Sequence, residues 1–170
     1  ILAKSEQNGH VCLYQHLKNV ADTARVMAKH LGFDEQIAVE GALLHDIGKA
    51  SPVFQQSLIS PNKKPGSVFR HEIASLFFLS LVCQEHRDAV IDMIVAHHKS
   101  MYKDVRDLGI LDLDDASDCF KEHSKLFPEW SHIAIDILES LGMETHEVSL
   151  EEAKENYEYV IDYCDGRKKG

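Results

Sequence analysis

Histidine and aspartate recur in the first hundred residues in a pattern that suits metal binding. His45 and Asp46 are adjacent, within the stretch Gly41 to Lys49. Four further histidines share helical or helix-terminal positions that point inward: His16, His71, His97 and His98. Imidazole and carboxylate bind transition metals, and one carboxylate can bridge two ions through its two oxygens. Burying such groups without partners costs several kcal/mol, and a metal ion removes that cost.

The first of these histidines falls on a predicted helix over residues 12–31. Apolar residues recur at intervals of three and four, at Leu13, Leu17, Val20, Ala24, Met27 and Leu31. His16 shares a face with Val20, Ala24 and Met27, so we expect that face to point toward the core. Gly32 is a fitting end. The alternative for His16 is a histidine at the edge of the core, bonded to a carbonyl.

A second helix delivers the His-Asp pair. Asp34 is a plausible N-cap, apolar positions follow at Ile37, Ala38, Ala42 and Leu44, and Gly48 is expected to end the helix. Small residues at 38, 41 and 42 would let another helix approach closely. Adjacent helical residues point about 100° apart, so His45 and Asp46 can reach one two-metal centre from different directions.

Further predicted helices carry the other histidines. A short helix runs from Pro52 to about residue 58, and Arg70 and His71 open an apolar helix over 73–82. A helix over 85–96 places His97 and His98 at its inward end; the alternative for this pair is two surface imidazoles stabilised by the helix dipole. Helices over 114–125 and 128–141, and a last one from the capping box at Ser149 to about residue 164, complete an all-α fold. We expect one domain over residues 1–170.

The charge of the chain is unevenly distributed. The net charge is −10, but residues 1–106 carry 12 basic and 11 acidic side chains, whereas residues 107–170 carry 6 and 17. A polyanionic substrate is therefore compatible with the first part, although strong non-specific binding to nucleic acid is not expected. No apolar run could span a bilayer and no leader opens the sequence, so we expect a cytoplasmic protein without a membrane partner.

The remaining cysteines and histidines show no motif. The four cysteines lie far apart and form no C-x-x-C pair, so we expect buried free thiols rather than a zinc knuckle or a redox site. The other six histidines have no partner pattern and are interpreted as surface or structural: His10, His30, His86, His123, His132 and His146.

The order of these residues resembles the HD superfamily of metal-dependent phosphohydrolases. More closely, it is similar to the HD nuclease of type I CRISPR systems, which works with a DNA-translocating helicase. The similar stretches are Ala3-Lys4-Ser5, His16 to Ala21, Leu44 to Gln55, Arg70 to Ser75 and Ala96 to Lys99. The run through Phe54-Gln55, together with the His-His pair, distinguishes this branch from ordinary HD enzymes.

The resemblance implies roles for individual residues. His16, His45 and Asp46 would hold a first metal ion, and Asp46 would bridge to a second ion held by His71, His97 and His98. Lys49 would neutralise a phosphate or the developing charge, so Asp46 and Lys49 are the candidate catalytic residues. Basic side chains flanking the ligands are candidates to follow a DNA strand, or else form a solvated rim: Lys63, Lys64, Arg70, Lys99, Lys103 and Arg106.

Ligand chemistry narrows the choice of metal. We expect one or two divalent transition-metal ions, from iron, manganese, nickel, cobalt and zinc; magnesium suits imidazole less well. Two ions roughly 3.5–4 Å apart would clamp the scissile phosphate and activate a water for in-line attack.

One departure from the family affects the first ion. The family also supplies an aspartate from a late helix, and the run around Asp162 and Asp165 does not match that pattern. We therefore expect the sequence to end before the last metal-ligand helix and the first ion to be held weakly.

Three functions remain open from the sequence. The favoured one is cleavage of single-stranded DNA in antiviral defence, with a helicase domain or subunit and an RNA-guided CRISPR surveillance complex as partners. The first alternative is an HD phosphohydrolase acting on nucleotides or other small phosphate esters. The second is a non-catalytic helical module stabilised by a metal.

Overall fold

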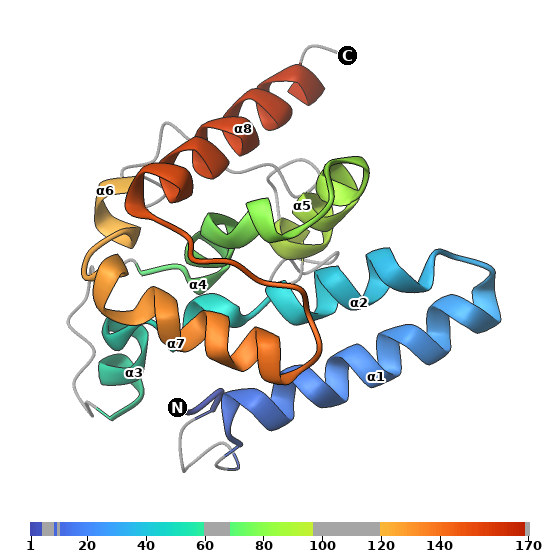
Figure 1. Cartoon of the computed structure of the whole chain (residues 1–170), viewed down its shortest axis with the longest axis horizontal. Coiled ribbons are helices and arrows are strands. Elements are labelled where there is room, and N and C mark those ends of the chain that lie inside the picture. Colours follow the sequence, from blue (N-terminus) through green and yellow to red (C-terminus); the bar gives the residue numbers. More distant parts are fainter. Residues whose placement is uncertain (5–8, 10, 60–68, 97–119, 169–170) are drawn as a thin grey trace.

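The computed structural model describes residues 1–4, 9, 11–59, 69–96 and 120–168, and most of these residues are helical (Figure 1). The α-helices are α1 (Leu13–Leu31), α2 (Glu35–Leu44), α3 (Pro52–Ile59), α4 (His71–Ser75), α5 (Arg87–Ala96), α6 (Phe120–His123), α7 (Phe127–Ser140) and α8 (Leu150–Lys168). Three 3₁₀ segments join them: η2 (Ile47–Ala50), η3 (Leu76–Leu81) and η4 (Gln84–His86). Within the described ranges, extended pairing is limited to an isolated bridge between Leu2 and Cys12. The predicted all-α fold is confirmed.

Helices α1 and α2 form an antiparallel hairpin whose ends are set by local signals. The Cys12 sulfur accepts a hydrogen bond from the Gln15 amide at the start of α1, and Gly32 ends it in the left-handed region, at φ 73°. Asp34 caps α2 by accepting from the amides of Gln36 and Ile37. The predicted stop and cap are therefore confirmed.

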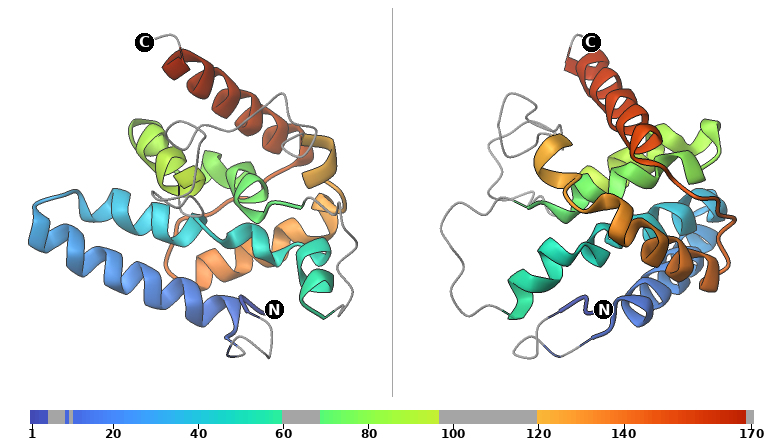
Figure 2. Two further views of the ribbon diagram at one scale, coloured as in Figure 1. Left: turned by 180° about the vertical axis from the view of Figure 1, so that it is seen from behind. Right: turned by 60° about the vertical axis from the view of Figure 1, so that its left-hand side comes forward.

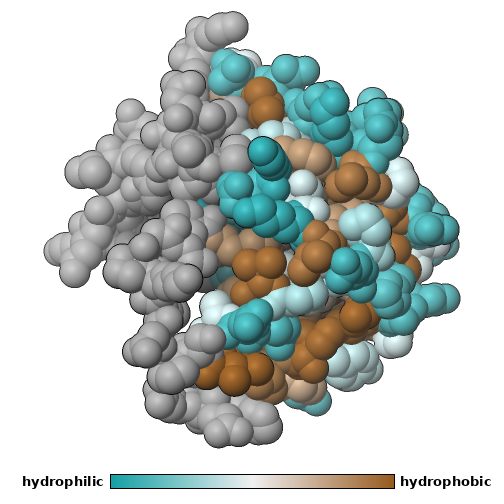
Figure 3. Space-filling model, turned by 90° about the vertical axis from the view of Figure 1, so that its left-hand side faces the viewer, coloured by the Kyte–Doolittle hydropathy of each residue, from teal (hydrophilic) through white to brown (hydrophobic). Residues whose placement is uncertain are grey.

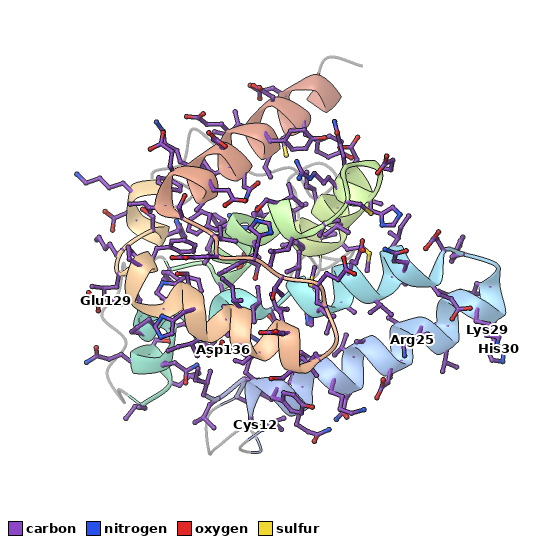
Figure 4. All side chains as sticks on the ribbon, viewed as in Figure 1. Cys12, Arg25, Lys29, His30, Glu129 and Asp136 are labelled. Atoms are coloured by element: carbon purple, nitrogen blue, oxygen red, sulfur yellow. The ribbon has the colours of Figure 1, made fainter. Side chains whose placement is uncertain are left out.

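The tip of this hairpin projects beyond the rest of the molecule (Figures 1 and 2). Figure 4 labels Lys29 and His30 near this tip and Cys12 at the opposite end of α1. The expectation that the face bearing Met27 points toward the core was wrong at Met27, which is 53% exposed, and Leu31, the last residue of the predicted apolar period, is 61% exposed. The 3.6-residue period gives the direction of a helix face, but it does not say how far the neighbouring elements extend over it.

The chain changes helix type directly after the His-Asp pair. His45 still has right-handed helical angles, whereas Asp46 has φ −123° and ψ 4°, and the 3₁₀ turn η2 follows. The expectation that α2 runs on to Gly48 is corrected accordingly: the α-helix ends at Leu44. Angles of this kind lie between the helical and extended regions and are frequent among active-site residues.

Gly48 lets η2 lie directly against α4. A Cβ atom at this position would be 2.1 Å from the carbonyl oxygen of His71 and 2.8 Å from the amide nitrogen of Ser75. The Gly48 amide donates to the Ser75 hydroxyl at 2.9 Å, and that hydroxyl contacts the His45 carbonyl at 3.3 Å. Only glycine permits this approach, which fixes the His-Asp pair relative to His71.

The small residues of α2 also allow close packing, as predicted. Helix α2 packs against α1 and α5, and a Cβ atom on Gly41 would be 2.5 Å from the terminal methyl of Met93 on α5. This neighbour is a flexible side chain rather than backbone. Ala42 is buried at the same interface region.

The predicted single helix, opened by Arg70 and His71 and continuing over 73–82, is divided instead into α4 and η3. Four consecutive apolar side chains of η3 are fully buried, from Leu76 to Leu79, so packing acts on every side of this segment. The side-chain amide of Asn156 on α8 donates to the Phe77 carbonyl at 2.9 Å and to the Ser80 hydroxyl at 3.0 Å. Tertiary contacts thus support the tighter winding. Of the helix expected over 114–125, Phe120–His123 is helical, and residues 114–119 lie outside the described ranges.

Buried apolar side chains form one cluster that includes residues from Ala3 to Cys164. Its centre is aromatic: Phe77, Phe78, Phe127 and Trp130 make edge and tilted contacts with centroids 5.2–5.6 Å apart. Hydrophobic and hydrophilic residues are interspersed over the described part of the face in Figure 3. No described helix is both long and apolar enough to traverse a bilayer.

The expectation of buried thiols is only partly met. Cys164 is buried, but Cys12 and Cys83 are exposed, and Cys119 lies outside the described residues.

Candidate metal centre

Three separate parts of the fold bring polar side chains together around Asp46. His16 comes from the first turns of α1, His45 and Asp46 from the junction of α2 and η2, and His71 from the first position of α4. Asp46 is 3% and His71 8% exposed, so the group lies largely within the protein. The helix break at Asp46 turns this carboxylate toward α1 and α4.

The two oxygens of Asp46 face different partners. Oδ2 is 2.7 Å from Nε2 of His16 and 3.3 Å from Nε2 of His45. Oδ1 is 2.9 Å from Nε2 of His71. One carboxylate thus meets two imidazoles through one oxygen and a third through the other, which is the division of ligands that a bridging carboxylate would require.

Hydrogen bonding fixes which nitrogen of His45 is available. Nδ1 lies 2.6 Å from the carbonyl of Ala42, which can only accept, so Nδ1 carries a proton. In the neutral ring Nε2 therefore presents its lone pair to the carboxylate of Asp46. Two lone pairs facing each other at 3.3 Å require a proton or a metal cation between them.

The donor atoms of His16, His45 and Asp46 suit a divalent ion in both type and spacing. Ligand atoms of His16, His45 and Asp46 all lie within 4.8 Å of one another. They are nitrogen and oxygen donors of the kind that zinc, iron, manganese, cobalt and nickel accept.

Lys49 occupies the same side of the carboxylate. Its Nζ is 2.6 Å from Oδ2 of Asp46 and 5.8 Å from the centre of the Phe54 ring. The residue is only 9% exposed. Its ammonium group therefore lies beside the candidate metal ligands. The catalytic role of Lys49 stays a prediction.

Helix α3 fastens the segment that bears Lys49. The ring of Phe54 meets that of His71 edge-on, with centroids 5.1 Å apart. The Gln55 side chain donates to the carbonyls of Lys49 and Leu2, at 2.7 and 2.8 Å, and accepts from the Leu2 amide. Phe54 and Gln55 therefore position two candidate site residues and the start of the chain.

A second layer of contacts holds the start of α4. Nε of Arg70 donates to the buried carboxylate of Glu72 at 2.7 Å. Burial alone would raise the pKa of Glu72, but the hydrogen bond and charge of Arg70 hold the pKa below its ordinary value. The Arg70 amide donates to Nε2 of His123, which is fully buried. Arg70 thus has a structural role, and contact with a DNA strand stays a prediction.

Seven of the candidate residues lie outside the described ranges, namely His97, His98, Lys63, Lys64, Lys99, Lys103 and Arg106. Asp162 and Asp165 are described, and both are exposed on α8. Neither belongs to the group of possible ligands around Asp46. Among the described residues, the possible ligand group around Asp46 therefore contains no second carboxylate for the first ion.

Sequence reasoning missed several partners of the site. Glu72 and His123 accept hydrogen bonds from Arg70 at the start of α4. Away from this site, Glu40 on α2 pairs with His86 at the end of η4. A glutamate two residues after Arg70 is a weak local signal for the first pair. His123 and Glu40 carry no such signal, because their partners lie 53 and 46 residues away.

In the described part of the chain, histidines from separate helices surround a His-Asp pair, which is an arrangement that can bind metal ions. The chain matches the HD domain family over residues 13–119, more than half of its length, and it therefore belongs to that family. HD domains are generally metal-dependent phosphohydrolases that bind divalent ions. The chain matches no curated protein and no solved structure.

Proposed function

We propose that this HD domain is a metal-dependent phosphodiesterase that cleaves single-stranded DNA. In this proposal it serves CRISPR antiviral defence together with a helicase and an RNA-guided surveillance complex. The observation that carries the proposal is the arrangement around Asp46, where one oxygen meets His16 and His45 and the other meets His71. That arrangement suits two ions that share one carboxylate, as phosphodiester hydrolysis often uses.

The positions of the residues that distinguish the nuclease branch support nuclease activity over hydrolysis of nucleotides. Phe54 and Gln55 distinguish the nuclease-like sequence run, and they contact His71, Lys49 and the Lys49 carbonyl. Two of the residues that carry the resemblance therefore lie beside the candidate centre. The remainder of the implied ligand set is His97 and His98.

In the proposed reaction, four residues would bind the metal ions and Lys49 would bind the phosphate. When bound, the divalent ions would supply Lewis acidity toward the phosphate. His16, His45, Asp46 and His71 would hold them, with Nδ1 of His45 fixed by the Ala42 carbonyl. The ammonium group of Lys49, which lies beside Asp46, would bind a phosphate oxygen, and this charge would count most in the transition state.

The test compares substrates at equal concentration with each of Mn²⁺, Co²⁺, Ni²⁺, Fe²⁺, Zn²⁺ and Mg²⁺. An end-labelled single-stranded oligonucleotide, the same sequence as a duplex, and a panel of nucleotides are incubated with the protein and with Asp46→Ala. We expect cleavage of the single strand with the transition metals, and none with chelator or with Asp46→Ala. Hydrolysis of nucleotides while the single strand stays intact would refute the proposal in favour of the small-molecule alternative.

A third outcome would identify the non-catalytic alternative. If no substrate is hydrolysed while a chelator lowers the midpoint of thermal unfolding, the metal has a structural role only.

A further inference from the structure

A second group of metal-ligating side chains lies between α2 and η4. Glu40 is in the middle of α2, Cys83 precedes η4, and His86 ends it. Their ligand atoms lie within 4.8 Å of one another. We propose that Glu40, Cys83 and His86 bind a divalent ion of the zinc class, at a site separate from the centre around Asp46.

The contacts of His86 show why a cation suits this position. Its Nδ1 is 2.7 Å from Oε2 of Glu40 and 3.0 Å from Sγ of Cys83. A single proton on Nδ1 can form one good hydrogen bond, to either Oε2 or Sγ. A dication would attract the lone pairs of the nitrogen, the oxygen and the sulfur together. Thiolate, imidazole and carboxylate are together the usual donors of zinc sites.

The spacing is close to what zinc needs. Bonds of about 2.0–2.3 Å in a tetrahedron separate ligand atoms by roughly 3.3–3.6 Å. The observed contacts are shorter, so the three side chains would open by roughly half an ångström around an ion. Cys83 is exposed and Glu40 and His86 are half-buried, which leaves room for that movement.

The surroundings are acidic, and a cavity lies beside two of the three ligands. Glu40 and Cys83 also line a cavity of about 440 Å³, whose wall includes Glu35, Glu144 and, on α1, Arg25 (Figure 4). Desolvation and the charges of Glu40 and Glu85 raise the pKa of Cys83. The same negative field attracts a dication, and ion binding would release the thiol proton, so affinity should fall as the pH falls.

The position suggests what such an ion would stabilise. Helix α2 packs against α5, and the three ligands connect α2 to the segment that leads into α5. Helix α2 ends immediately before His45, and α5 ends immediately before residues 97 and 98. An ion here would fasten together the two helices that lead to both halves of the proposed ligand set.

The test uses Co²⁺ as a probe for zinc in the full chain, after removal of bound metal with a chelator. Thiolate bound to Co²⁺ gives a charge-transfer absorption in the near ultraviolet, which nitrogen and oxygen ligands do not give. We expect this absorption in the unaltered protein and its loss in Cys83→Ser. Cys12→Ser is the matched control, because Cys12 is also an exposed free thiol, and it should retain the absorption.

Glu40→Gln tests the carboxylate. The affinity for Co²⁺, measured by titration of this absorption, should fall by about tenfold or more in this variant. Absence of the absorption at saturating Co²⁺ would overturn the proposal, and so would its persistence in Cys83→Ser. The group around Asp46 contains no described cysteine, so a failed nuclease test leaves this result unaffected.

A stability measurement in the Asp46→Ala background gives a second readout. Zinc should raise the midpoint of thermal unfolding of Asp46→Ala, and it should not raise that of Asp46→Ala combined with Cys83→Ser. Equal shifts in both proteins would contradict the assignment.

Discussion

Replacing Gly48 with alanine should separate the two halves of the candidate centre. The added Cβ would lie 2.1 Å from the His71 carbonyl oxygen and 2.8 Å from the Ser75 amide nitrogen, and both are backbone atoms that cannot rotate away. Relief requires η2 to move off α4, and that movement would break the hydrogen bond from Gly48 to the Ser75 hydroxyl. It would also move Asp46 away from His71.

The expected cost follows from these two losses. Overpacking against a rigid neighbour costs about 1–3 kcal/mol, and a lost buried hydrogen bond adds about 1 kcal/mol. Gly48→Ala should therefore lower the free energy of unfolding by about 2–4 kcal/mol, and the midpoint of thermal unfolding by roughly 5–15 °C for a chain of this size.

Gly41→Ala is the matched control. It adds the same methyl group to a buried glycine, but the atoms it meets belong to the flexible Met93 side chain. Alanine also gains up to about 1 kcal/mol of helix propensity there, so the net change should stay within about 1 kcal/mol. Urea unfolding followed by circular dichroism, with chelator present, measures both. Equal effects of the two substitutions would refute the reasoning about backbone contact.

Four further predictions concern the centre and its supporting helix. Asp46→Ala should abolish hydrolysis together with metal loading of the centre around Asp46, because it removes the bridge; retained turnover in the purified variant would contradict that role. Lys49→Met should keep the metal content, measured by elemental analysis, but lower turnover, whereas loss of metal would assign Lys49 a structural role. Elemental analysis of Cys83→Ser, which removes the second site from the count, should find fewer than two tightly held ions per chain, and two would mean that another carboxylate completes the first set. Backbone hydrogen bonds from Ile37 and Gln36 lower the pKa of Asp34, so its cap stabilises α2 above the ordinary aspartate pKa and is lost as the pH falls through the lower folded value. The difference in unfolding midpoint between the unaltered protein and Asp34→Ala should be full at pH 7 and should shrink below about pH 4.

Local signals in the sequence determined much of the helical framework. Asp34 and Gly32 mark helix ends through interactions within a few residues, so their roles could be predicted without tertiary information. The types of the His and Asp side chains likewise indicated metal chemistry, because ligand preference belongs to the side chain itself. The helical period did not predict the exposure of Met27 and Leu31, because the burial of a helix face depends on which other elements cover it.

Only the tertiary structure decided how the centre is assembled. The break after His45, the separate partners of the two Asp46 oxygens and the contact of Gly48 with α4 all depend on segments brought together by folding. The group formed by Glu40, Cys83 and His86 could not be predicted either, since Glu40 and His86 are 46 residues apart and no local motif joins them. Local propensity specifies where helices begin and end, whereas packing between helices specifies which side chains meet.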